Sequence, residues 1–161
     1  MKKAYLRINI FCYLIIAAFL VVMVTTSLRS GYPWALTCYN CVLCRQACPL
    51  GIDPYGFVTA ALTSDPDLYV AATNVRLKLK EAFDLDPGMV LRTKNGTTIT
   101  AARALDEGMG EDREVTVEKM KVKHAARYCV LCGNCEKVCP LNLKVMDIIM
   151  ELRDDGKFNR E

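Results

Sequence analysis

An uninterrupted apolar segment near the N-terminus is the clearest feature of the hydrophobic pattern. No charged residue occurs between Arg7 and Arg29, and the 21 residues of segment 8–28 are mostly aliphatic or aromatic. At about 1.5 Å per residue, a helix of this length spans roughly 31 Å, which matches the hydrocarbon core of a bilayer. We therefore predict a transmembrane anchor over residues 1–30 that contacts the lipid bilayer through residues 8–28.

A cleaved signal peptide is the alternative interpretation of this segment. Its apolar core would be unusually long, and no clear small-x-small cleavage site precedes the first cysteine run. Tyr5, Tyr32 and Trp34 flank the segment, where an aromatic belt would meet the lipid headgroups. The length and the flanks favour a retained anchor.

Beyond the anchor, residues 31–161 are predicted to form one further domain in which helical patterns prevail. Pro54 and Pro66 stand where helices begin, and Asp86-Pro87-Gly88 stands where one ends. The last helix is expected to stop at Gly156. The predicted helices cover residues 54–63, 65–83, 101–107 and 141–152.

A β-hairpin interrupts the helical pattern. Asn95-Gly96 separates two β-prone stretches, and this pair supplies the positive φ angles of a type I′ turn. The polar stretch 108–114 is expected to be an exposed loop. Two interpretations stay open for the next segment: Thr116 caps a helix, or the alternation of Val115 and Val117 marks a strand. The predicted fold class is mainly α, with a small β-hairpin insertion.

Eight of the nine cysteines fall into two runs of identical spacing. Residues 38–50 and 129–141 both read C-x2-C-x2-C-x3-C-P-L. This spacing is typical of ferredoxins that bind [4Fe–4S] clusters, in which closely spaced thiolates wrap one cluster. A secreted disulfide scaffold would scatter its cysteines along the chain, so the clustering favours metal.

Two [4Fe–4S] clusters are therefore predicted, with crossed ligation. In a two-cluster domain, the fourth cysteine of each run ligates the cluster held by the other run. The first predicted ligand set is Cys38, Cys41, Cys44 and Cys139. The second predicted ligand set is Cys129, Cys132, Cys135 and Cys48.

Zinc is the main alternative, but all-thiolate zinc sites pair two C-x2-C units across a longer loop. Cys12 lies inside the anchor without a second thiol or histidine beside it, so we interpret it as a small apolar residue. His124 is the only histidine, and its lysine and arginine neighbours favour a solvated side chain. A single histidine also excludes a bis-histidine haem held by this chain alone.

The charge balance gives no indication of nucleic-acid binding. The chain has 21 Lys+Arg and 18 Asp+Glu, and Lys2, Lys3 and Arg7 account for the excess of three. No basic stripe with interleaved aromatic residues is present. Three basic residues lie in or beside the cysteine runs, where they would either raise cluster potentials or remain ordinary solvated side chains: Arg45, Lys137 and Lys144.

With both cysteine runs, the chain resembles the α-helical ferredoxin family, which includes the small two-cluster subunit of heterodisulfide reductase and the C-terminal domain of succinate dehydrogenase-type iron–sulfur subunits. The resemblance covers about residues 35–155 and implies a helical domain with two nearby clusters. It further implies an electron-transfer subunit in a larger oxidoreductase complex. Because cysteines fill all eight cluster-ligand positions, we expect no substrate site of its own in this chain. The long segment between the runs and the N-terminal anchor depart from the family pattern.

The expected function is a relay of single electrons through two [4Fe–4S] clusters in a membrane-bound complex. Its partners would be a redox module and a catalytic or quinone-linked subunit. The alternative is a zinc-stabilised scaffold or assembly subunit without a redox role. Lys2, Lys3 and Arg7 favour a cytoplasmic N-terminus, which would place the cluster domain on the opposite face. The family resemblance favours the cytoplasmic face for the cluster domain, and we expect a single-pass membrane protein with this second placement.

Overall fold

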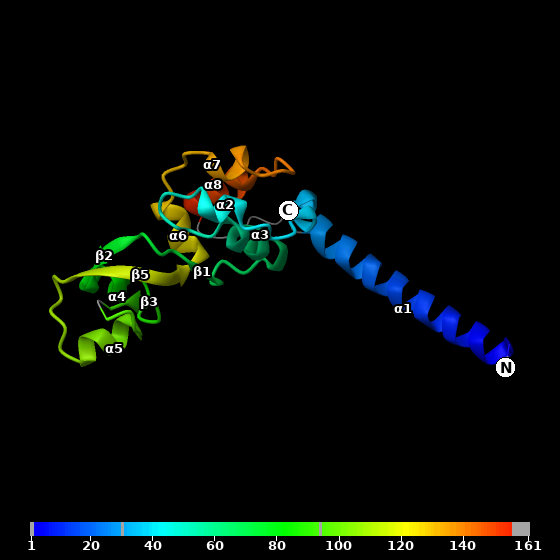
Figure 1. Ribbon diagram of the computed structural model, residues 1–161, viewed down its shortest axis with the longest axis horizontal. Coiled ribbons are helices and arrows are strands. Elements are labelled where there is room, and N and C mark those ends of the chain that lie inside the picture. The colour runs from blue at the N-terminus through cyan, green and yellow to red at the C-terminus, as the bar shows by residue number, and fades with distance from the viewer. Residues whose placement is uncertain (1, 30, 94, 156–161) are drawn as a thin grey trace.

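The computed structural model describes residues 2–29, 31–93 and 95–155. A 28-residue helix, α1 (Lys2–Arg29), extends away from the rest of the protein (Figure 1). Within α1, Tyr5–Arg29 is long and apolar enough to span a membrane, and no part of its most apolar window is buried. The predicted apolar helix is therefore present, with its large apolar side chains exposed.

Short helices form the part of the domain that carries both cysteine runs. The helices α3, α6 and α8 enclose the apolar core beneath these runs, and the small helices α2 and α7 lie within the runs. Buried side chains of α8 recur at the helical interval, at Val145, Ile148, Ile149 and Leu152. The bounds are η1 Pro33–Thr37 (a 3-10 helix), α2 Leu43–Gln46, α3 Pro54–Thr63, α6 Val122–Tyr128, α7 Asn134–Lys137 and α8 Val145–Asp155.

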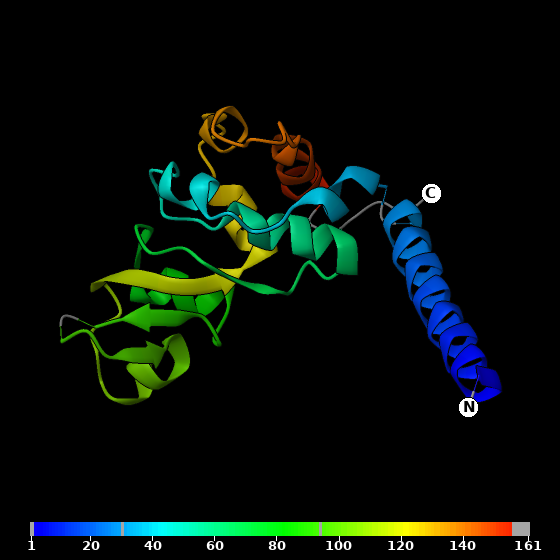
Figure 2. The ribbon, with the colours of Figure 1, turned by 45° about the vertical axis from the view of Figure 1, so that its right-hand side comes forward.

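An antiparallel sheet with two more helices lies between the cysteine runs in the sequence. Its elements are β1 Tyr69–Ala71, β2 Arg76–Lys78, α4 Leu79–Leu85, β3 Val90–Arg92, β4 Thr98–Thr100, α5 Ala101–Asp106 and β5 Glu114–Lys121. The long strand β5 pairs with both β1 and β2 along one edge and with β3 along the other, and β4 ends the sheet beyond β3. Figure 2 shows the helical part between this sheet and α1.

The sheet meets the helical part through α3 and α6. Asp53 is the N-cap of the α3 helix, and its carboxylate accepts a hydrogen bond from the Tyr55 amide at 3.2 Å; the chain then continues from α3 into β1. A Cβ on Gly56 would lie 1.9 Å from the Val70 side chain, so glycine lets α3 pack directly on β1. At the other end, β5 continues into α6, which delivers the chain to the second cysteine run.

The prediction of a helix over residues 65–83 is wrong. Asp65 instead makes a turn, because its carboxylate accepts a hydrogen bond from the Asp67 amide at 2.9 Å. The strands β1 and β2 follow, and a helix begins only at Leu79. Val75, Leu77 and Leu79 are buried in alternation with exposed charged residues, which is a strand pattern. The predicted helix 54–63 is confirmed, and 101–107 is confirmed to within one residue.

The hairpin is confirmed as β3–β4, but it belongs to a five-stranded sheet rather than to a small insertion. Its turn also differs from the predicted one. The Thr93 amide donates to the Thr97 carbonyl at 2.9 Å and the Gly96 amide donates to the Thr93 carbonyl at 3.0 Å, so Thr93, and not the residue next to Asn95, closes the hairpin opposite Thr97. Lys94 lies outside the described residues, as does the helix stop expected at Gly156.

Three other expectations have clear outcomes. The strand interpretation of residues 114–121 is the correct one, because β1, β2 and β3 all pair with this segment. The C-terminal helix begins at Val145 rather than Leu141, because Asn142 has a positive φ of 49°. His124 is not solvated: it is 8% exposed, and burial lowers its pKa below the ordinary 6.5, with Lys123 and Arg127 lowering it further.

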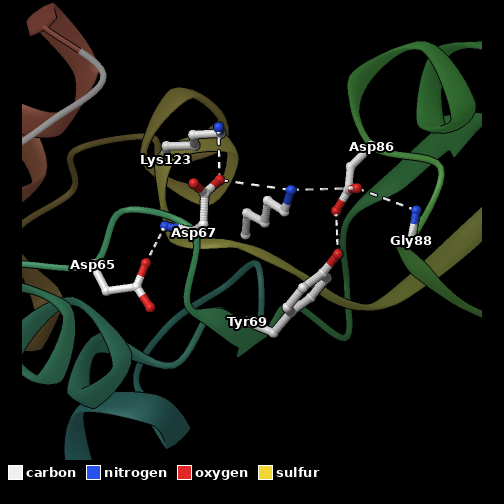
Figure 3. A network of polar contacts seen from close by, with 7 residues as sticks. Asp65, Asp67, Tyr69, Asp86, Gly88 and Lys123 are labelled. Atoms are coloured by element: carbon white, nitrogen blue, oxygen red, sulfur yellow. Dashed lines mark hydrogen bonds and ion pairs between the residues drawn. The ribbon is translucent and has the colours of Figure 1, made fainter.

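A buried carboxylate joins three parts of the sheet region (Figure 3). Asp86, 6% exposed, accepts a hydrogen bond from the Tyr69 hydroxyl at 2.6 Å and another from the Gly88 amide at 3.1 Å. Lys121 on β5 lies 3.6 Å from both Asp86 and Asp67. Burial and the bond to Asp86 raise the pKa of Tyr69 to about 12, so its hydroxyl remains a donor.

We expect Asp86→Ala to destabilise the protein by about 2–4 kcal/mol, because it leaves the part-buried Tyr69 hydroxyl and the Gly88 amide without their acceptor and removes one of the two carboxylates beside Lys121. The matched control is Asp112→Ala, which removes a 3.2 Å ion pair to Lys78 from a side chain that is 94% exposed. This control is expected to cost about 0.5 kcal/mol or less. Urea unfolding of both variants in the same detergent measures the difference, and equal costs would contradict the prediction.

Candidate metal centre

The two cysteine runs fold in the same way. Positive φ angles occur at three matched pairs of positions: Asn40 and Leu131 (both 53°), Val42 and Gly133 (67° and 71°), and Gly51 and Asn142 (60° and 49°). Each run then makes one short helix, α2 or α7, that begins directly after Val42 or Gly133. The repeat seen in the sequence is therefore also a repeat of backbone conformation.

Left-handed conformations at Val42 and Leu131 are unusual for such side chains, and a residue held there costs roughly 1–3 kcal/mol. The fourth cysteine follows the short helix, and its amide donates to a carbonyl of that helix in both runs, from Cys48 to Arg45 and from Cys139 to Glu136. Strained backbone of this kind is characteristic of functional loops.

The eight cysteines gather around two cavities. Four thiols line the first cavity together with Cys135: Cys38, Cys41, Cys44 and Cys139. The second cavity is lined by Cys48, Cys129, Cys132 and Cys135. Each cavity thus receives three cysteines of one run and the fourth cysteine of the other run, and Cys135 lines the first cavity as well as the second.

The two cavities share a wall. Pro54, the first residue of α3, lines both of them, and so does Cys135 of α7. Apart from cysteines, the walls consist of glycine, proline, aliphatic, aromatic and methionine side chains, among them Ile52, Phe57 and Ile149. The positive end of the α3 dipole therefore meets both cavities, where it favours negative charge. The cavities are close neighbours, as efficient electron transfer between two centres requires.

Burial sets the protonation of the thiols. It raises the pKa of Cys44 to about 11 and that of Cys135 to about 12, and it also raises the pKa of Cys129. These cysteines are protonated thiols at neutral pH unless a metal binds them. Cluster binding requires thiolates, so it must release these protons.

The donor set fits [4Fe–4S] chemistry, because the eight cysteine thiols of the two cavities supply four ligands for each of two clusters, within the apolar walls usual for such a cluster. Within residues 2–29, 31–93 and 95–155, no three His, Cys, Asp or Glu side chains lie close enough to hold a single metal ion. All nine cysteines are free of disulfides.

The other residues considered from the sequence lie away from the cavities. Cys12 is exposed on α1, and Arg45, Lys137 and Lys144 are exposed and line neither cavity. The residues that sequence reasoning missed are those of the shared wall, above all Pro54. A proline that starts a helix a few residues after a cysteine run was the available signal.

Comparison with known families agrees with this geometry. A model described as "4Fe-4S dicluster domain" matches residues 34–143, which include both cysteine runs. The chain belongs to the 4Fe-4S dicluster domain family. This membership supports [4Fe–4S] clusters and an iron–sulfur electron-transfer role for the dicluster domain. No curated protein and no solved structure matches the chain significantly.

The matched backbone of the dicluster domain predicts that Val42 and Gly133 are interchangeable. Gly133 lines the second cavity, but a Cβ on it meets nothing within 4 Å, and valine already occupies the matched position. We expect Gly133→Val to cost about 1–2 kcal/mol through its positive φ while the iron content stays unchanged. Val42→Gly should stabilise the fold by about 1 kcal/mol.

The control for these variants is Gly108→Val, which has the same backbone situation (φ 77°, nothing within 4 Å) far from the cysteines. Thermal unfolding and iron analysis measure both effects. Loss of iron in Gly133→Val alone would show that the side chain at this position faces the cavity, so the two runs would not be equivalent.

Proposed function

We propose that this chain is the electron-transfer subunit of a membrane-bound oxidoreductase. It passes single electrons through two [4Fe–4S] clusters between a partner redox module and a catalytic or quinone-linked subunit. The observation that carries this proposal is the pair of adjoining cavities, each lined by cysteines from both runs. Every cysteine of the two runs has a place in this arrangement, and none is left over for substrate chemistry.

The proposed ligands follow the crossed arrangement. Cys38, Cys41, Cys44 and Cys139 hold one cluster, and Cys129, Cys132, Cys135 and Cys48 hold the other. Cys135 lines both cavities, and its position in the second run assigns it to the second cluster. The sharing of Pro54 and Cys135 between the walls supports rapid transfer between the two centres.

The protein itself positions the clusters, shields them from water and tunes their reduction potentials. When bound, the clusters supply reversible one-electron redox chemistry. Apolar walls that include Ile52 and Phe57 limit the access of water, and the α3 N-terminus at Pro54 stabilises the added negative charge of the reduced state. We assign no catalytic residue to this chain, so turnover takes place on other subunits.

The α1 helix is the proposed membrane anchor. Its apolar side chains are exposed over the whole candidate span, and lipid is the environment that such a surface requires. The anchor is tied to the cluster domain, because the Tyr32 hydroxyl donates to Glu151 on α8 and the Ser27 hydroxyl donates to the Pro33 carbonyl at 3.0 Å. We place the cluster domain on the cytoplasmic face, where such clusters are assembled.

The surface of the cysteine runs supports assembly with other subunits. Outside α1, eight described large apolar side chains are exposed, and six of them lie in the two runs: Tyr39, Val42, Leu43, Val130, Val138 and Leu141. The short helices of the two runs contact each other, so this apolar surface is shared by both. Apolar surface that is concentrated over redox centres is typical of a docking site for another protein.

Metal analysis and EPR spectroscopy of the purified membrane protein test the proposal. We expect about eight iron and eight sulfide per chain, as two [4Fe–4S] clusters require, and a reversible signal that accounts for two electrons. Turnover of substrate by the isolated chain is not expected. Zinc without a reducible iron signal would overturn the proposal in favour of a zinc-stabilised scaffold.

Single cysteine variants test the crossed ligands. We expect Cys139→Ser to alter the same EPR signal as Cys41→Ser, and Cys48→Ser to alter the same signal as Cys132→Ser. The control is Cys12→Ser on α1, which should leave both signals unchanged. If Cys139→Ser instead alters the signal that Cys132→Ser alters, the ligands are not crossed.

A further inference from the structure

The sheet region carries two adjoining hollows that no cysteine lines. The first, of about 250 Å³, has an apolar floor that includes Leu91, Ile99 and Met109. The second, of about 490 Å³, follows the β4 strand and shares Thr93, Ile99, Met109 and Arg113 with the first. Because they share these four residues, we treat them as one depression and call it the sheet groove. The helical part lies between the sheet and α1 (Figure 2).

Arginines dominate the rim of the sheet groove. Its lining includes four arginines, Arg76, Arg92, Arg103 and Arg113, and two carboxylates, Glu107 and Glu114. Arg76 on β2 and Arg92 on β3 are both opposite Thr116 of β5, and paired residues project from the same face of a sheet. This excess of positive charge contrasts with the chain beyond the N-terminal flank, where basic and acidic residues balance.

Two of these arginines are available for a ligand. Arg92 lies 2.7 Å from Glu118, and Arg103 lies 3.0 Å from Glu107, so both are already paired. Arg76 and Arg113 make no ion pair within the described part of the chain.

The loop between α5 and β5 borders the groove, and ion pairs neutralise two of its acidic side chains. Asp112 pairs with Lys78 and Glu111 pairs with Lys80, each at 3.2 Å. The Arg113 carbonyl accepts a hydrogen bond from the Leu79 amide at 2.9 Å, which fixes the backbone of the loop beside β2. The Arg113 side chain is therefore the free charge that this loop presents to the groove.

The groove also borders a free strand edge. β4 ends the sheet, and its residues Thr98 and Ile99 line the second hollow. Thr93 and Thr97 are joined by a backbone hydrogen bond, and hydrogen-bonded and non-hydrogen-bonded pairs alternate in an antiparallel ladder. The next pair, Arg92 and Thr98, therefore exchanges no backbone hydrogen bond, and the backbone N–H and C=O of Thr98 point away from β3. An extended peptide can add to such an edge as a further strand.

We propose that the sheet groove docks an extended acidic segment of a partner polypeptide. The segment pairs with β4, its carboxylates bind Arg76 and Arg113, and its apolar side chains cover the half-buried Ile99 and Met109. A small inorganic anion would use the guanidinium groups but neither the apolar floor nor the strand edge. This proposal is independent of the clusters, because the groove contains none of the predicted ligands.

Peptide binding to the full chain in detergent, with its clusters in place, tests this proposal. The probe is a fluorescein-labelled octapeptide of alternating glutamate and valine, measured by fluorescence anisotropy. We expect the double variant Arg76→Gln/Arg113→Gln to weaken binding by about tenfold or more, since each Arg–carboxylate bond is charge-assisted. The matched control, Arg45→Gln/Lys137→Gln, removes the same charge from the cysteine runs and should leave the affinity unchanged.

Three results would overturn the proposal. The first is failure of the wild-type chain to bind the probe at millimolar concentration. The second is equal binding by the wild type and the Arg76→Gln/Arg113→Gln variant, or equally tight binding of a lysine–valine peptide. The third is complete displacement of the probe by an equal concentration of inorganic phosphate, which would identify a small-anion site instead.

Discussion

Each of the two cavities is lined by three cysteines of one run and by the fourth cysteine of the other run. The path of the chain between the two runs depends on this arrangement. Cys48 and Cys129 must meet although 80 residues separate them in the sequence. The intervening segment therefore has to leave the cavities and return to them. It does so by way of α3 and β1 on the outward path and β5 and α6 on the return, and these strands pair with each other. The pairing of β1 with β5 thus brings the two cysteine runs together.

The return of the chain to the second cysteine run also determines where the apolar core lies. α3, α6 and α8 pack beneath the runs, and side chains of α3 and α8 form inner walls of the cavities. Pro54 and Phe57 of α3 and Ile149 of α8 line the second cavity while belonging to this core or its edge. Metal binding and apolar packing are therefore coupled, and a bound cluster would contribute directly to the free energy of folding.

The surfaces of the protein divide into three regions of different chemistry. α1 is apolar on all sides and joins the domain through η1, where Tyr32 and Trp34 pack against the core instead of extending freely as a belt. The cysteine runs expose apolar side chains around the proposed clusters. The sheet groove presents arginines at the far side of the helical part from α1. In the proposed complex, these regions contact lipid, a redox partner and an acidic polypeptide segment, so they need not compete with one another.

The sequence alone determined the features that depend on neighbouring residues. The apolar segment 8–28, the spacing of the two cysteine runs and the start of α3 at Pro54 are local, and the structure shows α1 and α3 in these places. The strands β1 and β2 were missed because three-residue strands carry little pattern of their own and acquire stability from β5, more than 35 residues later. The prediction of a solvated His124 is wrong for a similar reason, because charged neighbours in the sequence do not show whether tertiary contacts bury the side chain. Only the tertiary structure decided which thiols share a cavity and which arginines share a groove, because both arrangements depend on contacts between segments that are distant along the chain.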